Sequence, residues 1–286
     1  MLELRSREES ILPGHYPYQG YGLVLSLLRR SAPRIAEAVH NAAVKPLAVA
    51  VLGPPWPVAP APRRVRAGDV LRVRVACLRD DVFAALAEAV LSHARGEPVE
   101  LGEARFDIVR LATTPAETRW AGCVGVEDLL ARAEPSPALR LRFFTPTTFR
   151  SKGRRNVMFP EPELLVRGYA RRWRQAGGPS VSPELEDTLV QRTIVARYSL
   201  RSGMVDFGHY AESGFVGTCE LRIVRSRDDN LSRTLQALGS FAGFAGTGAK
   251  TAMGLGLTAR ATDGHPLRER ARRATEDPAG EAPSRG

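Results

Sequence analysis

The chain has 286 residues, of which 43% are hydrophobic and 25% charged, as in an ordinary soluble globular protein of one large domain or two smaller ones. Its 41 basic and 31 acidic side chains give a formal net charge of +10, which favours a polyanionic partner, either nucleic acid or an anionic membrane surface. A membrane-spanning helix and a secretory signal are excluded by the lack of suitable apolar runs, and the three cysteines lack zinc-type spacing. We therefore expect a cytoplasmic protein with no metal or other cofactor.

The first part of the chain shows the order strand, helix, strand, strand, helix, strand. Apolar residues at helical spacing predict a helix over Tyr21–Arg30, and Pro33 suits the first turn of a second helix that runs to His40. Alternating apolar residues over 71–78 are typical of a half-buried strand. The other predicted elements of this part are strands at 1–5, 47–52 and 106–111 and a helix at 80–91.

The same order recurs after a connector over 113–137, which holds a short helical segment. Two βαββαβ units in series predict an α+β fold with two tandem ferredoxin-like domains, residues 1–135 and 136–262. RRM-type RNA binders share this topology with many unrelated proteins. Residues 263–286 are rich in charge and poor in large apolar side chains, which predicts a disordered tail. The elements of the second unit are predicted at 139–144, 194–200, 215–224 and 251–261 for strands and at 161–174 and 231–244 for helices.

A glycine-rich segment with a single lysine runs from residue 243 to residue 256. Glycines adopt positive φ angles and let backbone N–H groups approach a phosphate closely, and Lys250 adds a positive charge. A Walker A loop is the first alternative, but Ala249 separates the last glycine from the lysine, and a helix precedes the loop instead of following it. A glycine turn with a purely structural role is the second alternative. The residues expected to contact RNA here are Gly246, Gly248, Lys250, Thr251, Gly254 and Gly256.

The segments Gly214–Gly217, Phe241–Gly248 and Lys250–Gly256 resemble the C-terminal signature of the CRISPR-associated endoribonucleases of the Cas6 type, which belong to the RAMP superfamily. Phe143–Arg150 and Phe159–Glu163 agree with the same family. The resemblance spans about residues 1 to 260 and is more specific in the C-terminal half. It implies two ferredoxin-like domains and an enzyme that cuts precursor CRISPR RNA within its repeats.

RNA cleavage without a metal requires a base that activates the 2′-OH and an acid that protonates the departing 5′-oxygen, and it leaves 2′,3′-cyclic phosphate and 5′-hydroxyl ends. Histidine suits both proton transfers because its ordinary pKa is about 6.5. His40 ends the predicted helical segment, where the helix dipole favours positive charge, and Glu37 lies three residues earlier on the same face. The resemblance implies a general acid/base histidine at this place. The alternative is a histidine that merely ends the helix.

Three further residues are candidates near His40. Lys45, in the turn after the helix, is expected to stabilise charge on the phosphorane, although a solvated turn lysine is the alternative. His15 lies in the loop before the first helix and is expected to approach the same cleft. Tyr21 at the start of that helix, or alternatively Tyr18, is expected to position the ribose there. For His15 the alternative is an ordinary polar loop residue.

The densest basic loop follows the first strand of the second unit, and a loop of this kind contacts phosphates of an RNA stem or of a single strand. Its basic residues are Arg150, Lys152, Arg154 and Arg155. We expect a metal-independent endoribonuclease whose partner is CRISPR repeat RNA, and no membrane partner. A non-catalytic RAMP-type subunit that holds CRISPR RNA in an effector complex is the alternative, and a multi-subunit complex and a homodimer stay open.

Overall fold

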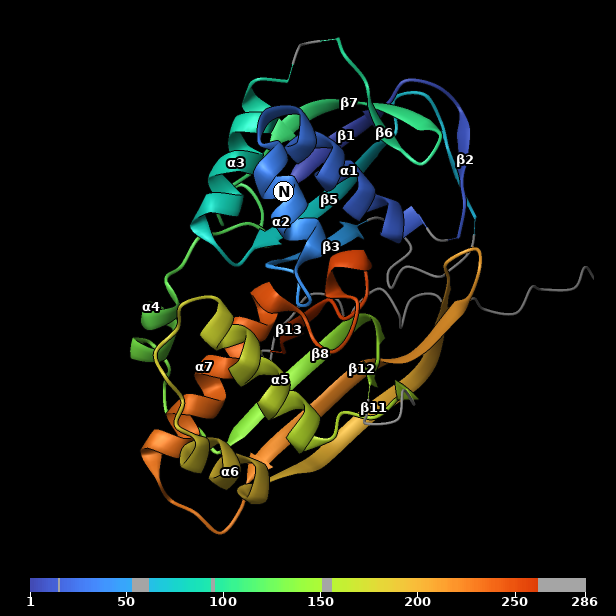
Figure 1. The fold of residues 1–286 in the computed structure, drawn as a ribbon. Coiled ribbons are helices and arrows are strands. Elements are labelled where there is room, and N and C mark those ends of the chain that lie inside the picture. Colours follow the sequence, from blue (N-terminus) through green and yellow to red (C-terminus); the bar gives the residue numbers. More distant parts are fainter. Residues whose placement is uncertain (15, 53–61, 94–95, 151–155, 262–286) are drawn as a thin grey trace, which may run out of the picture.

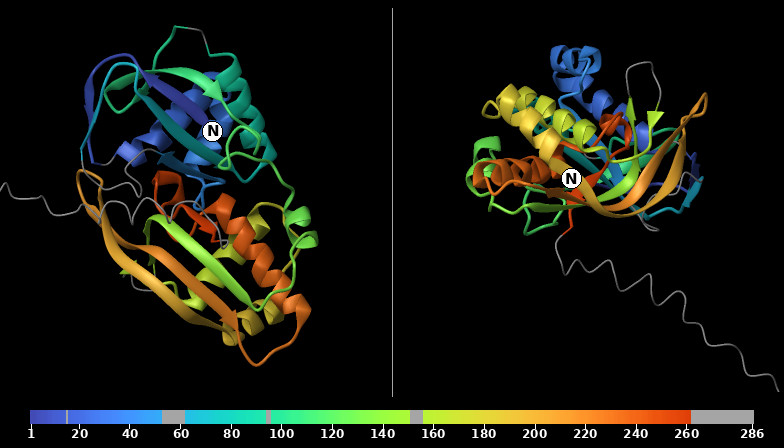
Figure 2. Two further views of the ribbon diagram at one scale, coloured as in Figure 1. Left: turned by 180° about the vertical axis from the view of Figure 1, so that it is seen from behind. Right: turned by 90° about the horizontal axis from the view of Figure 1, so that it is seen from below.

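The chain folds into two antiparallel sheets, each carrying helices on one face, in a computed structural model that describes residues 1–14, 16–52, 62–93, 96–150 and 156–261. The N-terminal half lies above the C-terminal half in Figure 1, and the segment that holds α4 (Val126–Ala131) joins them at one side. Figure 2 shows the same two halves from behind and from below. The predicted tail at 263–286 lies outside the described residues.

The N-terminal sheet has the strand order of a ferredoxin-like fold. Its strands are β3 (Leu47–Leu52), β5 (Val70–Cys77), β1 (Leu2–Ser6), β7 (Ala104–Leu111) and β6 (Val99–Leu101), in that spatial order. The first strand of the unit therefore lies between the third and the fourth, and β6 is added at the edge. The helices that pack with this sheet are α1 (Tyr16–Ser31), α2 (Pro33–Asn41) and α3 (Asp80–Leu91), and β2 (Ser10–Leu12) pairs with β4 (Arg63–Val65).

The C-terminal sheet repeats this order, with β11 (Thr193–Asp206), β12 (Ala211–Ile223), β8 (Ala138–Thr147) and β13 (Thr258–Arg260) side by side. The helices are α5 (Pro162–Gln175), α6 (Pro183–Arg192) and α7 (Asp229–Ala245), and β9 (Phe149–Arg150) pairs with β10 (Asn156–Val157). Both units thus confirm the predicted α+β fold with two ferredoxin-like domains. Trp173 of α5 packs edge-on against Phe241 of α7, and both rings are fully buried in the core between helices and sheet.

The prediction of a strand over 251–261 is wrong for most of its length. Thr251–Met253 form a 3-10 helix, η1, and only Thr258–Arg260 pair as a strand. The physical reason is the glycine content, because four glycines with positive φ reverse the chain direction repeatedly before β13 begins. Those glycines are Gly246, Gly248, Gly254 and Gly256.

The glycine-rich loop lies where the two domains meet. Ala252 of η1 is buried in the hydrophobic core of the N-terminal domain, and η1 contacts both α1 and β3. A Cβ on Gly254 would come within 2.6 Å of the Pro17 Cβ in α1, so the two backbones touch at this glycine. Arg74 of β5, whose burial lowers its pKa to about 10, donates from Nη2 to the Gly243 carbonyl at 2.6 Å and so binds the C-terminal end of α7. No helix in the described part of the chain is long and apolar enough to cross a membrane.

Candidate active site and RNA-binding surface

His40 lies in the last turn of α2, as predicted. Ala36 and Val39 of this helix are buried, so the next residue along the helix faces solvent. The imidazole of His40 is exposed, and among the residues that the structure describes it has no hydrogen-bond or ion-pair partner. The ion pair between His40 and Glu37 that their helical spacing suggested is not formed in the part of the chain that the structure describes. An exposed imidazole without a protein partner is free to exchange protons with a bound substrate.

Lys45 folds its side chain back onto the end of α2. Its Nζ donates to the carbonyl of His40 and, at 2.8 Å, to the carbonyl of Ala42. These carbonyls belong to the helix end, which has no intrahelical donors left for them, so the ammonium caps the helix. Lys45 thereby fixes the last turn of α2 and keeps a positive charge next to the backbone of His40.

The remaining two candidates of the N-terminal domain are Tyr21 and His15. Tyr21 lies in α1 with its side chain buried in the core, and its hydroxyl has no hydrogen-bond partner among the described residues. Burial raises the pKa of this phenol, with the neighbouring Tyr18 adding to the effect. Tyr21 therefore supports the helix from inside, and His15 lies outside the described residues.

The backbone of the glycine-rich loop is largely bonded within the protein. The N–H groups of Thr247, Ala249 and Gly256 donate to the carbonyls of Gly256, Thr148 and Pro146, at 2.8, 2.8 and 3.0 Å. These hydrogen bonds hold the loop to β8, to Thr148 just after β8, and to itself. These three N–H groups are therefore not available to a phosphate, and for them the alternative of a glycine turn with a purely structural role applies.

Hydroxyl groups beneath the loop connect it to α5. The Tyr169 hydroxyl lies 2.6 Å from the Thr247 Oγ1, and Arg172 donates from Nη1 to the Thr251 Oγ1 at 2.5 Å. Arg172 is only 6% exposed, and burial lowers its pKa to about 10. Arg172 therefore supports Thr251 from inside the protein.

Basic and acidic side chains meet at the start of the predicted basic loop. Arg150 of β9 donates from Nη2 to the Glu212 Oε1 at 3.2 Å while more than half of its side chain stays exposed. Lys250 forms a second ion pair with Glu212. The other residues of the basic loop, Lys152, Arg154 and Arg155, lie outside the described residues.

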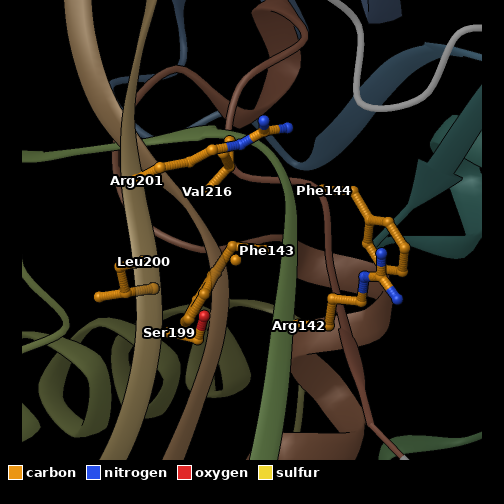
Figure 3. A pocket seen from close by; sticks show the side chains of 8 residues that line it. Arg142, Phe143, Phe144, Ser199, Leu200, Arg201 and Val216 are labelled. Carbon is orange, nitrogen blue, oxygen red and sulfur yellow. The ribbon is translucent and has the colours of Figure 1, made fainter. Parts of the chain in front are cut away.

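A pocket that sequence reasoning missed lies across β11, β12 and β8 of the C-terminal sheet. It has a volume of about 250 Å³ and is lined by residues of all three strands, among them Arg142 of β8 and Arg201 of β11 (Figure 3). The Arg142 guanidinium lies 5.1 Å from the Phe144 ring centroid. Neither arginine has a carboxylate partner among the described residues. The alternation of apolar and basic residues in β8 was the signal for this face, because every second side chain of a strand points away from the core.

Comparisons with known proteins agree with this geometry. A sequence model of the family described as CRISPR-associated endoribonuclease Cas6 matches residues 141–258. A Cas6 product complex is similar at 30% sequence identity, with 91% of this chain and 98% of that chain covered and a TM-score of 0.72. The chain belongs to the Cas6 family. Another product complex, of a Cas6 from Thermus thermophilus, is 29% identical over 91% of this chain and 98% of that chain, with a TM-score of 0.77.

A further matched Cas6 structure is a histidine-to-alanine mutant, 27% identical over 92% of this chain and all of that chain, with a TM-score of 0.68. No curated protein matches the sequence. The Cas6 range 141–258 runs from β8 to β13 and contains the β11–β12 hairpin, the pocket and the glycine-rich loop. His40 lies N-terminal to the matched range.

Proposed function

We propose that the chain cuts precursor CRISPR RNA within its repeats, without a metal ion, and that His40 carries the proton transfers. The observation that supports this most directly is an exposed, unpartnered histidine at the end of α2, braced by Lys45, in a member of the Cas6 family. The histidine-to-alanine mutant among the matched Cas6 structures draws attention to a histidine in that relative as well.

The proposed reaction is an in-line attack of a ribose 2′-OH on the adjacent phosphate. His40 takes the proton from the 2′-OH or gives a proton to the departing 5′-oxygen, and the products carry 2′,3′-cyclic phosphate and 5′-hydroxyl ends. Lys45 contributes positive charge beside the helix end, where negative charge develops on the phosphorane. His15, in the segment before α1, is the proposed second proton carrier, and Tyr21 acts indirectly by holding α1.

The RNA is proposed to bind along the basic side of the C-terminal domain. Arg150 presents an exposed guanidinium at the start of the basic loop, and we assign phosphate contacts to Lys152, Arg154 and Arg155 in that loop. The glycine-rich loop contacts α1 through η1, and the RNA is proposed to pass this loop on its way to His40. Gly246, Gly248, Thr251, Gly254 and Gly256 shape this passage.

The arginine pocket of the C-terminal sheet is expected to hold one part of the RNA strand. RNA affinity falls as the salt concentration rises, and the plot of log affinity against log salt becomes less steep by about 0.7 when one arginine that contacts a phosphate of a single strand is removed. We expect Arg201→Ala to show this change without loss of fold, because its side chain is exposed and has no partner among the described residues. The measurement is repeat-RNA affinity at several salt concentrations, with Arg132→Ala at the C-terminal cap of α4 as the control. An unchanged slope for Arg201→Ala would show that the pocket does not contact the RNA.

The test of the proposed function is cleavage of repeat RNA from the protein's own locus in the presence of EDTA. The expected result is unimpaired cleavage that leaves 5′-hydroxyl ends. Cleavage that stops in EDTA, or that leaves 5′-phosphates, would refute the proposed chemistry. Binding without any cleavage by the wild-type protein would instead support the alternative, a RAMP-type subunit that only holds CRISPR RNA.

The proposed setting is the cytoplasm, where the protein acts alone or delivers its product to a multi-subunit CRISPR effector complex. Light scattering of the protein with and without repeat RNA would distinguish a monomer from the homodimer that stays open.

A further inference from the structure

The side chain of Lys250 is enclosed by protein groups, although sequence reasoning assigned it to an RNA phosphate. Its Nζ lies 4.1 Å from the centroid of the Tyr210 ring and 4.7 Å from that of Phe207, and it donates to the Tyr210 hydroxyl at 2.9 Å. It also forms an ion pair with Glu212, and only 13% of its side chain is exposed. A cation held by two ring faces and a carboxylate has its charge largely compensated.

Glu212 connects this lysine to the base of the basic loop. Its side chain is 6% exposed and receives hydrogen bonds from the Asn156 Nδ2 at 2.7 Å and the Arg150 Nη2 at 3.2 Å as well as from Lys250. Burial opposes the charged form, but the hydrogen bonds from Lys250 and Asn156 outweigh it and lower the pKa of Glu212. One carboxylate therefore binds β9, β10 and the glycine-rich loop to β12.

The ring of Phe207, which lies beside Lys250, also joins the tip of the β11–β12 hairpin to the N-terminal domain. Phe207 stacks on Tyr210 with ring centroids 5.1 Å apart and meets Tyr18 of α1 edge-on at 5.7 Å. Phe207 also belongs to a small apolar cluster with Val205, Leu255 and the partly buried Met253, so the hairpin packs on the glycine-rich loop. Both views of the fold show the hairpin reaching from the C-terminal sheet to the N-terminal half (Figures 1 and 2).

The backbone at Lys250 supports the same conclusion. Its φ of 58° lies in the left-handed region, which non-glycine residues seldom occupy and which persists only where surrounding contacts enforce it. A lysine whose task was to reach a mobile phosphate would have no need of this conformation. The ion pair and the two rings are the contacts that hold the residue here.

We propose that Lys250 is a positioning residue: together with Glu212, Phe207 and Tyr210 it latches the glycine-rich loop and the base of the basic loop to the hairpin tip beside α1, and it does not contact an RNA phosphate itself. The latch is a property of the free protein. Its effect on RNA rests on the proposed function, because the loops that it aligns are those assigned to the repeat RNA.

Two substitutions separate this role from a direct contact. If Lys250 bound a phosphate, Lys250→Met would lower the salt slope by about 0.7–0.9, and Glu212→Gln would leave RNA affinity unchanged or raise it by freeing the lysine. If Lys250 instead positions the loops through its ion pair with Glu212, either substitution removes that ion pair, and both variants have the same effect on RNA binding. We expect each to weaken binding of repeat RNA about tenfold with an unchanged salt slope, and the double variant to be no weaker than either single one.

The binding assay uses the full chain and a repeat RNA blocked against cleavage by a 2′-deoxy substitution, with Arg132→Met as the control for removing a paired cation from an exposed site. A lower salt slope for Lys250→Met, or affinity retained by Glu212→Gln, would overturn the proposal, as would additive losses in the double variant. Circular dichroism melting of each variant confirms that it is folded.

Hydrogen exchange of the free protein tests the latch without RNA. Lys250→Met and Glu212→Gln are both expected to speed exchange in residues 205–212 and 246–256, and Arg132→Met is not. Unchanged exchange in these segments would overturn the latch. A wild-type protein that shows the latch by exchange but neither binds nor cuts repeat RNA would refute the proposed function alone.

Discussion

His40→Ala is expected to slow cleavage of repeat RNA by a factor of about 10²–10⁴, the contribution that a positioned acid or base makes to a rate. The imidazole is exposed and bonds to no described residue, so its removal leaves packing intact and changes stability by less than about 0.5 kcal/mol. RNA affinity is expected to stay within about twofold because His40 acts on the reacting atoms and adds little to binding. Single-turnover cleavage at saturating RNA, together with a binding titration, provides both numbers.

His93→Ala is the matched control for this substitution. His93 lies two residues beyond the end of α3, near a helix C-terminus as His40 is, but its Nε2 lies 2.9 Å from the Glu97 carbonyl oxygen, so its ring contacts the protein. We expect the control to cleave at the wild-type rate. A His40→Ala protein that cleaves as fast as the wild type would show that His40 merely ends its helix, the alternative that the sequence left open.

Gly256→Ala is expected to destabilise the fold by about 2–4 kcal/mol, the sum of a left-handed conformation forced on alanine and of steric overlap in a packed region. Gly256 has a φ of 67°, and a Cβ there would lie 1.9 Å from the Thr247 carbonyl oxygen, which is a backbone atom that cannot move aside. Relief requires the loop to open, which displaces it against α1. A displacement of about 1 Å is enough to reduce cleavage by about 10²-fold. Urea unfolding and the cleavage assay measure the two effects.

Gly243→Ala, in the same glycine-rich segment, is expected to change stability in the opposite direction. Gly243 lies in α7, and a Cβ there meets nothing within 4 Å. Alanine is the better helix former by about 0.5–1 kcal/mol, so the variant should be as stable as the wild type or slightly more so. Equal losses at both glycines would mean that the segment tolerates no side chain anywhere and would contradict the local explanation given for Gly256.

Local patterns were enough to predict most of the fold. Helical spacing predicted α1 and alternating residues predicted β5, because these periodicities come from the geometry of single elements. Pro33 marked the first turn of α2, which ends at Asn41, one residue beyond the predicted end. The repeated element order then predicted two ferredoxin-like domains, which the structure and the Cas6 matches confirm. The strand predicted over 251–261 failed because glycines at positive φ overrode the apolar pattern.

The partners of the charged residues were decided by the tertiary structure alone. The sequence showed Lys250 as a lysine among glycines, but Glu212 and Tyr210 reach it from another strand and a hairpin turn that lie about 40 residues earlier in the chain. Tyr21 was expected to approach the cleft beside His40, yet packing buries its side chain in the core. Composition and periodicity report which face of an element is apolar. Which charge is compensated, and which stays available to RNA, depends on contacts between residues far apart in the sequence, and only the folded chain brings those residues together.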